Sequence, residues 1–155
     1  MSTRIPPVRR EVEVSTDPRR AFELWTEQIG RWWPMASHSV HGEQASVAFD
    51  AGRLVETAPD GSPVVWGTVT AWEPPHRLAL TWHPGRDASE ATQVEVRFAP
   101  VGPGCTLVTL VHTGWEVLAE PEPMRASYET GWAVVLEPFA AAAHAPSPEA
   151  KDQAL

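Results

Sequence analysis

The chain has 155 residues, of which 43% are hydrophobic and 21% charged, so it is long enough for one globular domain with its own buried core. Its 12 basic and 20 acidic side chains give a net charge of −8, which argues against nucleic acid or an anionic membrane surface as the main partner, because both require a cationic face. The single cysteine, Cys105, excludes an internal disulfide and a four-cysteine zinc site.

The N-terminal part of the chain predicts an arm, one strand and two short helices. Residues 1–7 hold no apolar segment typical of a secretory leader, and no run approaches the roughly 20 apolar residues of a transmembrane helix, so we expect a cytoplasmic protein. Alternating hydrophobic residues predict a strand over Val8–Val14. Asp17 and Pro18 are typical of a helix start, and the helix is expected over 18–28, with a helical turn at 31–33.

Six further strands are predicted between residues 45 and 112. We expect them over 45–49, 52–57, 64–72, 77–83, 92–98 and 106–112. The short turns between them, of which Asp60-Gly61 is the clearest, favour antiparallel pairing. A strict period of two places these side chains of the third segment on one face: Val64, Trp66, Thr68, Thr70 and Trp72.

A long amphipathic helix is predicted near the C-terminus, from Pro121 to about Leu136, where Pro138 weakens or ends it. Its apolar face consists of Met124, Tyr128, Trp132, Val135 and Phe139. This face has no partner other than the sheet, so the helix is expected to lie across it in an α+β fold. We therefore predict one domain over 8–139, an arm over 1–7 and a flexible tail over 140–155.

Several segments, taken together in their order and spacing, resemble a known family. They are Thr16-Asp17-Pro18 with Ala21–Thr26, Gly52-Arg53 with Glu56, Asp60-Gly61, Trp66–Val69, Trp72–Leu78 with Leu80-Thr81-Trp82, Thr92–Val96, His112–Trp115 and Gly131-Trp132. The chain resembles the SRPBCC superfamily of birch-pollen allergen, START lipid-transfer domains and polyketide cyclases, and within it the branch of activators of the heat-shock protein 90 ATPase. It departs from the family pattern at Ala51-Gly52, where many relatives have two glycines.

The resemblance implies a helix-grip fold, in which a curved antiparallel sheet of about seven strands wraps on the long C-terminal helix and leaves a pocket between them. An empty apolar cavity costs about 24 cal/mol per Å³, so a dry pocket of roughly 300 Å³ would cost around 7 kcal/mol. We therefore expect the pocket to be hydrated or filled. Of the eight tryptophans, Trp25 and Trp72 are expected to be structural. The pocket is predicted to involve Trp33, Glu56, Trp66, Trp82, Val94, Val96, His112, Trp115, Met124, Tyr128 and Trp132.

Glu56 and His112 are the candidate polar pair of this pocket. Inside an apolar site, a carboxylate and an imidazole can orient a polar ligand group or move a proton. The alternative is that each caps a strand or turn, or that Glu56 points outward. His38 and His41 have a spacing that chelates a metal on a helix, but their surroundings predict a solvated loop, so neither a metal site nor a cofactor is expected. Cys105 has no neighbouring base in sequence that would activate it.

Three functions remain open at this stage. We favour a binding module that holds an apolar or aromatic small molecule without covalent catalysis, because the usual nucleophile and nucleotide motifs are absent from the sequence. The alternatives are an enzyme of the cyclase or aromatase type, with Glu56 or His112 as acid or base, and a regulator of a chaperone ATPase, which depends on the family name alone. The sequence is compatible with a monomer and with a homodimer.

Overall fold

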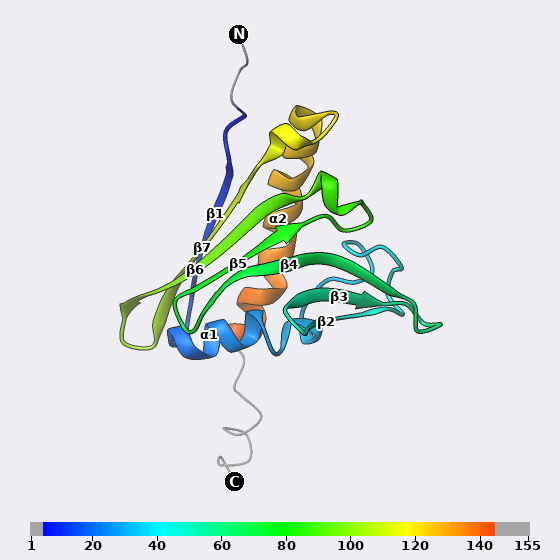
Figure 1. The fold of residues 1–155 in the computed structure, drawn as a ribbon. Coiled ribbons are helices and arrows are strands. Elements are labelled where there is room, and N and C mark those ends of the chain that lie inside the picture. Colours follow the sequence, from blue (N-terminus) through cyan, green and yellow to red (C-terminus); the bar gives the residue numbers. More distant parts are fainter. Residues whose placement is uncertain (1–4, 145–155) are drawn as a thin grey trace.

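The structure is a computed structural model and describes residues 5–144. Seven strands form one antiparallel sheet in the order β1-β7-β6-β5-β4-β3-β2, so the first strand lies beside the last. The long helix α2 (Pro121–His144) runs across the curved sheet, and the short helix α1 (Pro18–Trp25) lies near the C-terminal end of α2 (Figure 1). The strands are β1 (Val8–Val14), β2 (Ser46–Asp50), β3 (Arg53–Thr57), β4 (Pro63–Glu73), β5 (Arg77–Trp82), β6 (Thr92–Gly102) and β7 (Cys105–Thr113). The predicted α+β helix-grip fold is confirmed.

Helix α1 begins where the sequence predicts. The Asp17 carboxylate accepts a hydrogen bond from the Arg20 amide at 2.8 Å, and Pro18 occupies the first turn. The helix ends at Trp25 rather than at residue 28, because Thr26 leaves helical dihedral angles and its hydroxyl donates to the Phe22 carbonyl at 2.7 Å. A single 3-10 turn, Ile29–Arg31, follows in place of the second predicted short helix.

Strand β4 does not follow the predicted period of two. Trp66 is fully buried, but Thr68 and Thr70 are exposed, and the register with β5 shifts between Val69 and Ala71. At Gly67 the β5 backbone comes so close that a Cβ atom would lie 1.7 Å from the Thr81 carbonyl oxygen, so only glycine fits there. Trp72, predicted to be structural, packs edge-on against Phe22 and Phe49 but is 44% exposed.

Helix α2 continues through Pro138 to His144, so the predicted end near Leu136 is wrong. Proline removes the hydrogen bond to the carbonyl four residues earlier, at Val134, but Val134 is on the exposed side, where water can satisfy that carbonyl. Beyond the proline, Phe139 and Ala143 are buried, and Phe139 packs against Trp25 with a ring-centroid separation of 5.0 Å. This burial offsets the lost hydrogen bond. The rest of the predicted tail, 145–155, lies outside the described residues.

The arm before β1 is tied to α2. Arg125 donates from its guanidinium to the carbonyl oxygens of Pro6 and Pro7, at 2.7 and 2.9 Å. Arg10 of β1 donates to the Glu129 carbonyl of the same helix at 2.8 Å. None of the helices between residues 5 and 144 combines the length and the apolar character that crossing a membrane requires.

The turn between β2 and β3 carries a strain that one substitution is expected to relieve. Ala51 has φ 51° and Gly52 has φ 78°, the left-handed values of a two-residue hairpin turn in which glycine is preferred at both positions. We expect Ala51→Gly to raise the free energy of unfolding by about 0.5–1 kcal/mol, because it removes the contact of Cβ with the following backbone. Urea unfolding followed by tryptophan fluorescence measures the change.

The matched control is Ala48→Gly, at an exposed position in strand β2 of the same hairpin. At that position glycine relieves no backbone strain, and it increases the conformational entropy of the unfolded chain. We therefore expect the free energy of unfolding to decrease. A decrease for Ala51→Gly as well would contradict the assignment of strain to this turn.

Candidate functional site

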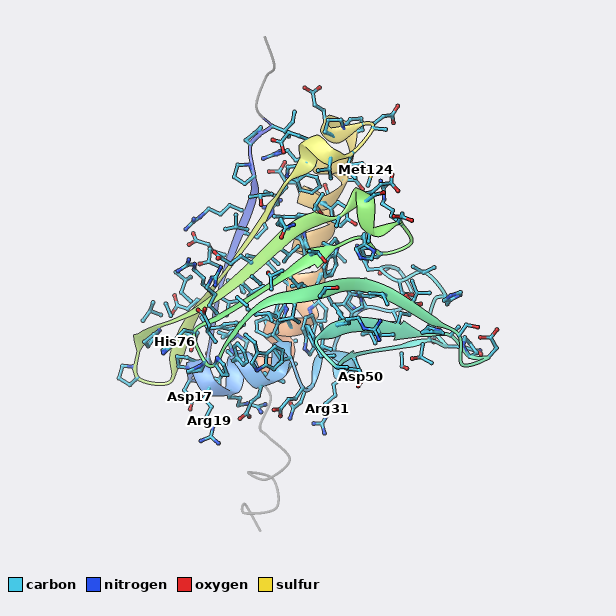
Figure 2. All side chains as sticks on the ribbon, viewed as in Figure 1. Asp17, Arg19, Arg31, Asp50, His76 and Met124 are labelled. Atoms are coloured by element: carbon cyan, nitrogen blue, oxygen red, sulfur yellow. The ribbon has the colours of Figure 1, made fainter. Side chains whose placement is uncertain are left out.

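A pocket of about 340 Å³ lies between the sheet and the N-terminal half of α2. Figure 2 shows Met124, one of its lining residues, at the end of α2 remote from Asp17 and Arg19 of the α1 region. Exposed residues such as Ser37 and Ser127 stand among the lining, so water can enter. The complete lining is Trp33, Ser37, His38, Ser39, Val40, Trp66, Trp82, Pro84, Met124, Ser127, Tyr128, Gly131, Trp132 and Val135. Because water can hydrate the pocket through these exposed polar residues, the pocket does not carry the energetic cost of a dry cavity of the same size.

Four tryptophans form what we call the indole wall: Trp33, Trp66, Trp82 and Trp132. Their ring centroids are 5.1 Å apart for Trp82 and Trp132 and 5.2 Å apart for Trp33 and Trp66, and the planes are tilted rather than parallel. All four are buried, with at most 6% of the side chain exposed. Rings that hold one another in this way present fixed faces and edges, which a planar aromatic ligand can meet without reorganisation of the wall.

Two hydrogen-bond donors accompany the indole wall. The Trp82 Nε1 atom is buried and makes no well-formed hydrogen bond with residues 5–144. The same side chain lies close to Tyr128. Burial raises the pKa of the Tyr128 hydroxyl, while the neighbouring Trp82 side chain and the positive charge of Arg86 reduce that increase. Tyr128 is therefore a neutral hydroxyl in the pocket. An N–H without a well-formed hydrogen bond and an adjacent O–H favour a ligand that carries oxygen acceptors.

Glu56 lies behind the pocket rather than in it. Its side chain is fully buried, and no cationic side chain within residues 5–144 forms an ion pair with it. Its Oε1 accepts from the Val40 amide at 2.8 Å and from Trp66 Nε1 at 3.0 Å, and its Oε2 accepts from the His41 amide at 2.6 Å. The carboxylate thus fixes the loop that forms one side of the pocket mouth, which matches the capping alternative rather than a ligand contact.

His112 is likewise enclosed behind the wall. Trp132 Nε1 donates to its Nδ1 at 2.9 Å, and since an indole N–H only donates, the proton of the imidazole must reside on Nε2. Nε2 then donates to Thr92 Oγ1 at 2.6 Å, and the Thr92 hydroxyl donates to the Trp82 carbonyl at 3.1 Å. Burial lowers the pKa of His112 to about 3. The ring is therefore neutral, has both nitrogens occupied, and does not contact Glu56.

Six of the predicted pocket residues line the pocket: Trp33, Trp66, Trp82, Met124, Tyr128 and Trp132. Five others do not: Glu56, Val94, Val96, His112 and Trp115. Val94 and Val96 are buried in β6, and the Trp115 ring stacks on His112 at 4.1 Å, so these three belong to the core behind the wall. The alternation of β6 correctly places Val94 and Val96 inward. The sequence pattern does not distinguish a buried residue near the pocket from one that lines it.

His38 is a pocket residue that the sequence does not single out. The segment is a loop, as expected, but its ring is half-buried and faces α2, with Nε2 at 3.6 Å from the place a Cβ of Gly131 would occupy. Its Nδ1 lies 2.7 Å from Ser37 Oγ. His41 turns away, toward the Asp60 turn. No cluster of three or more metal-ligating side chains occurs within residues 5–144, so the spacing of the two histidines does not translate into a metal site.

Comparison with solved structures gives the same fold in several proteins. The chain is similar to an anthrahydroquino-γ-pyrone synthase, Txn09, described as complexed with SUM, with 32% identity, TM-score 0.56 and coverage of 96% of this chain and 93% of that one. It is also similar to CalU16 from Micromonospora echinospora, with 20% identity, TM-score 0.59 and coverage of 92% and 78%. The Aha1 dimer from Colwellia psychrerythraea has 15% identity, TM-score 0.59 and coverage of 90% and 97%. The similarity to CalU16 and to the Aha1 dimer shows a shared fold and nothing more.

No curated protein matches this sequence. Residues 15–144 match the family described as Activator of Hsp90 ATPase homolog 1-like protein. That segment includes α1, the sheet from β2 to β7 and the whole of α2, so both the pocket and the elements that build it lie within the match. The chain therefore belongs to the Activator of Hsp90 ATPase homolog 1-like family, the AHSA-type branch of the SRPBCC superfamily.

Proposed function

We propose that this protein binds a planar aromatic small molecule with carbonyl or hydroxyl oxygens in the pocket beneath α2. The observation that carries the proposal is the combination of the indole wall with the buried Trp82 Nε1, which has no well-formed hydrogen bond within residues 5–144 and lies beside the Tyr128 hydroxyl. Four indoles supply faces and edges for an aromatic ring system. The N–H of Trp82 and the hydroxyl of Tyr128 supply donors for its oxygens. A purely aliphatic ligand would leave both donors unused.

The volume of about 340 Å³ lies within the range of pockets that take metabolite-sized molecules. Similarity to Txn09 supports the same ligand class, since the name of that protein describes an anthrahydroquinone-type ring system with a pyrone, and the two chains align over almost their whole length. A ligand of the aromatic polyketide type, with fused rings and ketone or phenol oxygens, has the shape and the acceptors that this pocket requires.

A second candidate function is ring closure of such a molecule, and the similarity to a pyrone synthase favours it. The acid–base residues suggested by the sequence do not support it, because the polar atoms of Glu56 and His112 are occupied by protein groups. Any proton transfer in this pocket therefore requires another residue.

Binding is tested with emodin, a planar trihydroxyanthraquinone, by quenching of tryptophan fluorescence and by calorimetry. We expect saturable binding that Ser127→Phe weakens at least about tenfold, equivalent to about 1.4 kcal/mol, since the new ring fills the pocket mouth from an exposed helix position. Ala126→Phe is the control, because Ala126 is exposed on the same helix but does not line the pocket.

Palmitate serves as the comparison ligand. Binding of palmitate in place of emodin, or equal effects of the two phenylalanine variants, would overturn the proposed ligand class and site. Interaction with a chaperone ATPase and a cytoplasmic location stay predictions. The Aha1 dimer shares only the fold with this chain, and its name transfers no partner.

A further inference from the structure

His38 lines the pocket mouth and has a free ring nitrogen. Within the part of the chain that is described, His38 forms a side-chain hydrogen bond through Nδ1, to Ser37 Oγ at 2.7 Å, and no partner occupies its Nε2. The ring lies against α2 at Gly131, where the absence of a side chain leaves room for it. Among the residues that line the pocket, His38 is the imidazole. His112 lies behind the wall with both nitrogens engaged, and His83, between Trp82 and Pro84, is outside the lining and bonds to the Arg86 carbonyl through Nδ1.

The backbone around His38 is held on both sides. Trp33 Nε1 donates to the His38 carbonyl at 2.7 Å, which joins the loop to the indole wall. Immediately after His38, the Ser39 hydroxyl donates to the Met35 carbonyl at 2.5 Å, and the next two amides donate to Glu56. A side chain on a loop with this many anchors keeps its position relative to the wall, as proton transfer requires.

A cation lies beside the pocket, near Met124 and Tyr128. Arg86 donates to Met124 Sδ at 3.0 Å and acts electrostatically on Tyr128. No carboxylate within residues 5–144 forms an ion pair with this guanidinium. Arg86 and the Tyr128 hydroxyl therefore favour negative charge on a ligand oxygen that develops near them.

We infer that His38 transfers the proton when a ligand bound in this pocket closes an oxygen-containing ring. In the first step, a phenol or enol oxygen of the ligand attacks a ketone carbon of the same molecule. The new C–O bond forms and the C=O π bond breaks. Nε2 of His38 takes the hydroxyl proton and returns it to the former ketone oxygen, which becomes the hydroxyl of a cyclic hemiketal.

In the second step, that hydroxyl leaves as water together with a hydrogen from the adjacent carbon, which gives the unsaturated pyrone ring. One water is released, and no atom is oxidised or reduced, so the reaction needs no cofactor. Ser37 is the positioning residue, because its hydroxyl holds Nδ1 and directs Nε2 into the pocket. This inference rests on the proposed binding of oxygenated aromatic ligands in the same pocket.

The test uses 1-(2-hydroxyphenyl)butane-1,3-dione, which closes to 2-methylchromone with loss of water and a change in ultraviolet absorbance. We expect the full-length protein to accelerate closure and His38→Gln to reduce the rate constant by about 100-fold or more, the usual contribution of a positioned acid–base group. His41→Gln is the matched control, since His41 is three residues away and outside the pocket lining. Ser37→Ala should give a smaller decrease in kcat with little change in KM.

Emodin affinity is measured on each variant and should change less than about threefold for His38→Gln, because proton transfer is not needed for binding. If emodin binds but the protein does not accelerate closure, or His38→Gln retains the rate of the unmodified protein, the inference is overturned while the proposed function stands. If emodin does not bind, the proposed function is overturned instead. Equal losses in His38→Gln and His41→Gln would also contradict the role of His38.

Discussion

Replacing Glu56 with glutamine is expected to lower the free energy of unfolding by about 3 kcal/mol and to weaken emodin binding about tenfold. The buried carboxylate accepts hydrogen bonds from two loop amides and from the Trp66 indole. Glutamine has nearly the same volume but offers one oxygen, and its NH₂ group faces an N–H donor at the other position. Charge-assisted hydrogen bonds are the strong ones, and a buried donor left without an acceptor loses its hydration without compensation.

The effect on binding follows because the amides that Glu56 holds belong to Val40 and His41, two and three residues after His38. Once this anchor is weakened, the loop moves relative to the indole wall and the mouth of the pocket loses its shape. Urea unfolding and emodin titration measure the two consequences. Glu43→Gln, an exposed change on the same loop, is the control and should alter neither. Unchanged stability in Glu56→Gln would show that the carboxylate does not hold the loop.

Most of the fold can be predicted from the sequence because the sheet is half-buried. Strands β1, β6 and β7 alternate cleanly between apolar and polar residues, and the buried positions in the structure, such as Val96 and Leu110, follow that period. The period fails in β4 because strand irregularities depend on neighbouring backbones. The register with β3 shifts opposite Leu54 and Val55, and the Thr81 carbonyl of β5 approaches Gly67 closely at the same place.

The pocket is less predictable than the fold, for a different reason. The aromatic stripe of α2 and the tryptophans of β4 and β5 identify the indole wall, since large apolar residues on facing elements must meet. His38 sits in a polar loop with no periodicity, and its place depends on Glu56, which lies 16 residues from Val40 in sequence. Glu56 and His112 are polar residues in otherwise apolar strands, and that pattern predicts a functional role. In sequence, however, a polar residue that anchors a loop or the indole wall cannot be distinguished from one that contacts a ligand.

Protein stability is expected to fall as the pH is lowered from 7 to 5, by about 2 kcal/mol, through His112 alone. Burial holds the pKa of His112 at about 3 in the folded protein, against about 6.5 for an unfolded chain. Between these values the unfolded state binds a proton that the folded state does not, so protonation favours unfolding and the free energy of unfolding decreases with decreasing pH. About one unit above pH 6.5 and higher, the contribution is constant, because His112 is then neutral in both states.

The physical cause is the network around the ring, which has no place for a second proton. Charging Nδ1 would direct an N–H at the Trp132 N–H, 2.9 Å away, inside a shell of aromatic rings. His112→Gln retains an amide that can accept from Trp132 and donate to Thr92, but it does not titrate. We expect it to be less stable at pH 7, because the stacking on Trp115 is lost, and to show a much flatter pH dependence. Urea midpoints between pH 7 and pH 5 give the slopes, with the exposed His76→Gln as control. If His112→Gln and the unmodified protein lose stability in parallel, His112 does not stay neutral in the folded protein, and the loss belongs to other groups.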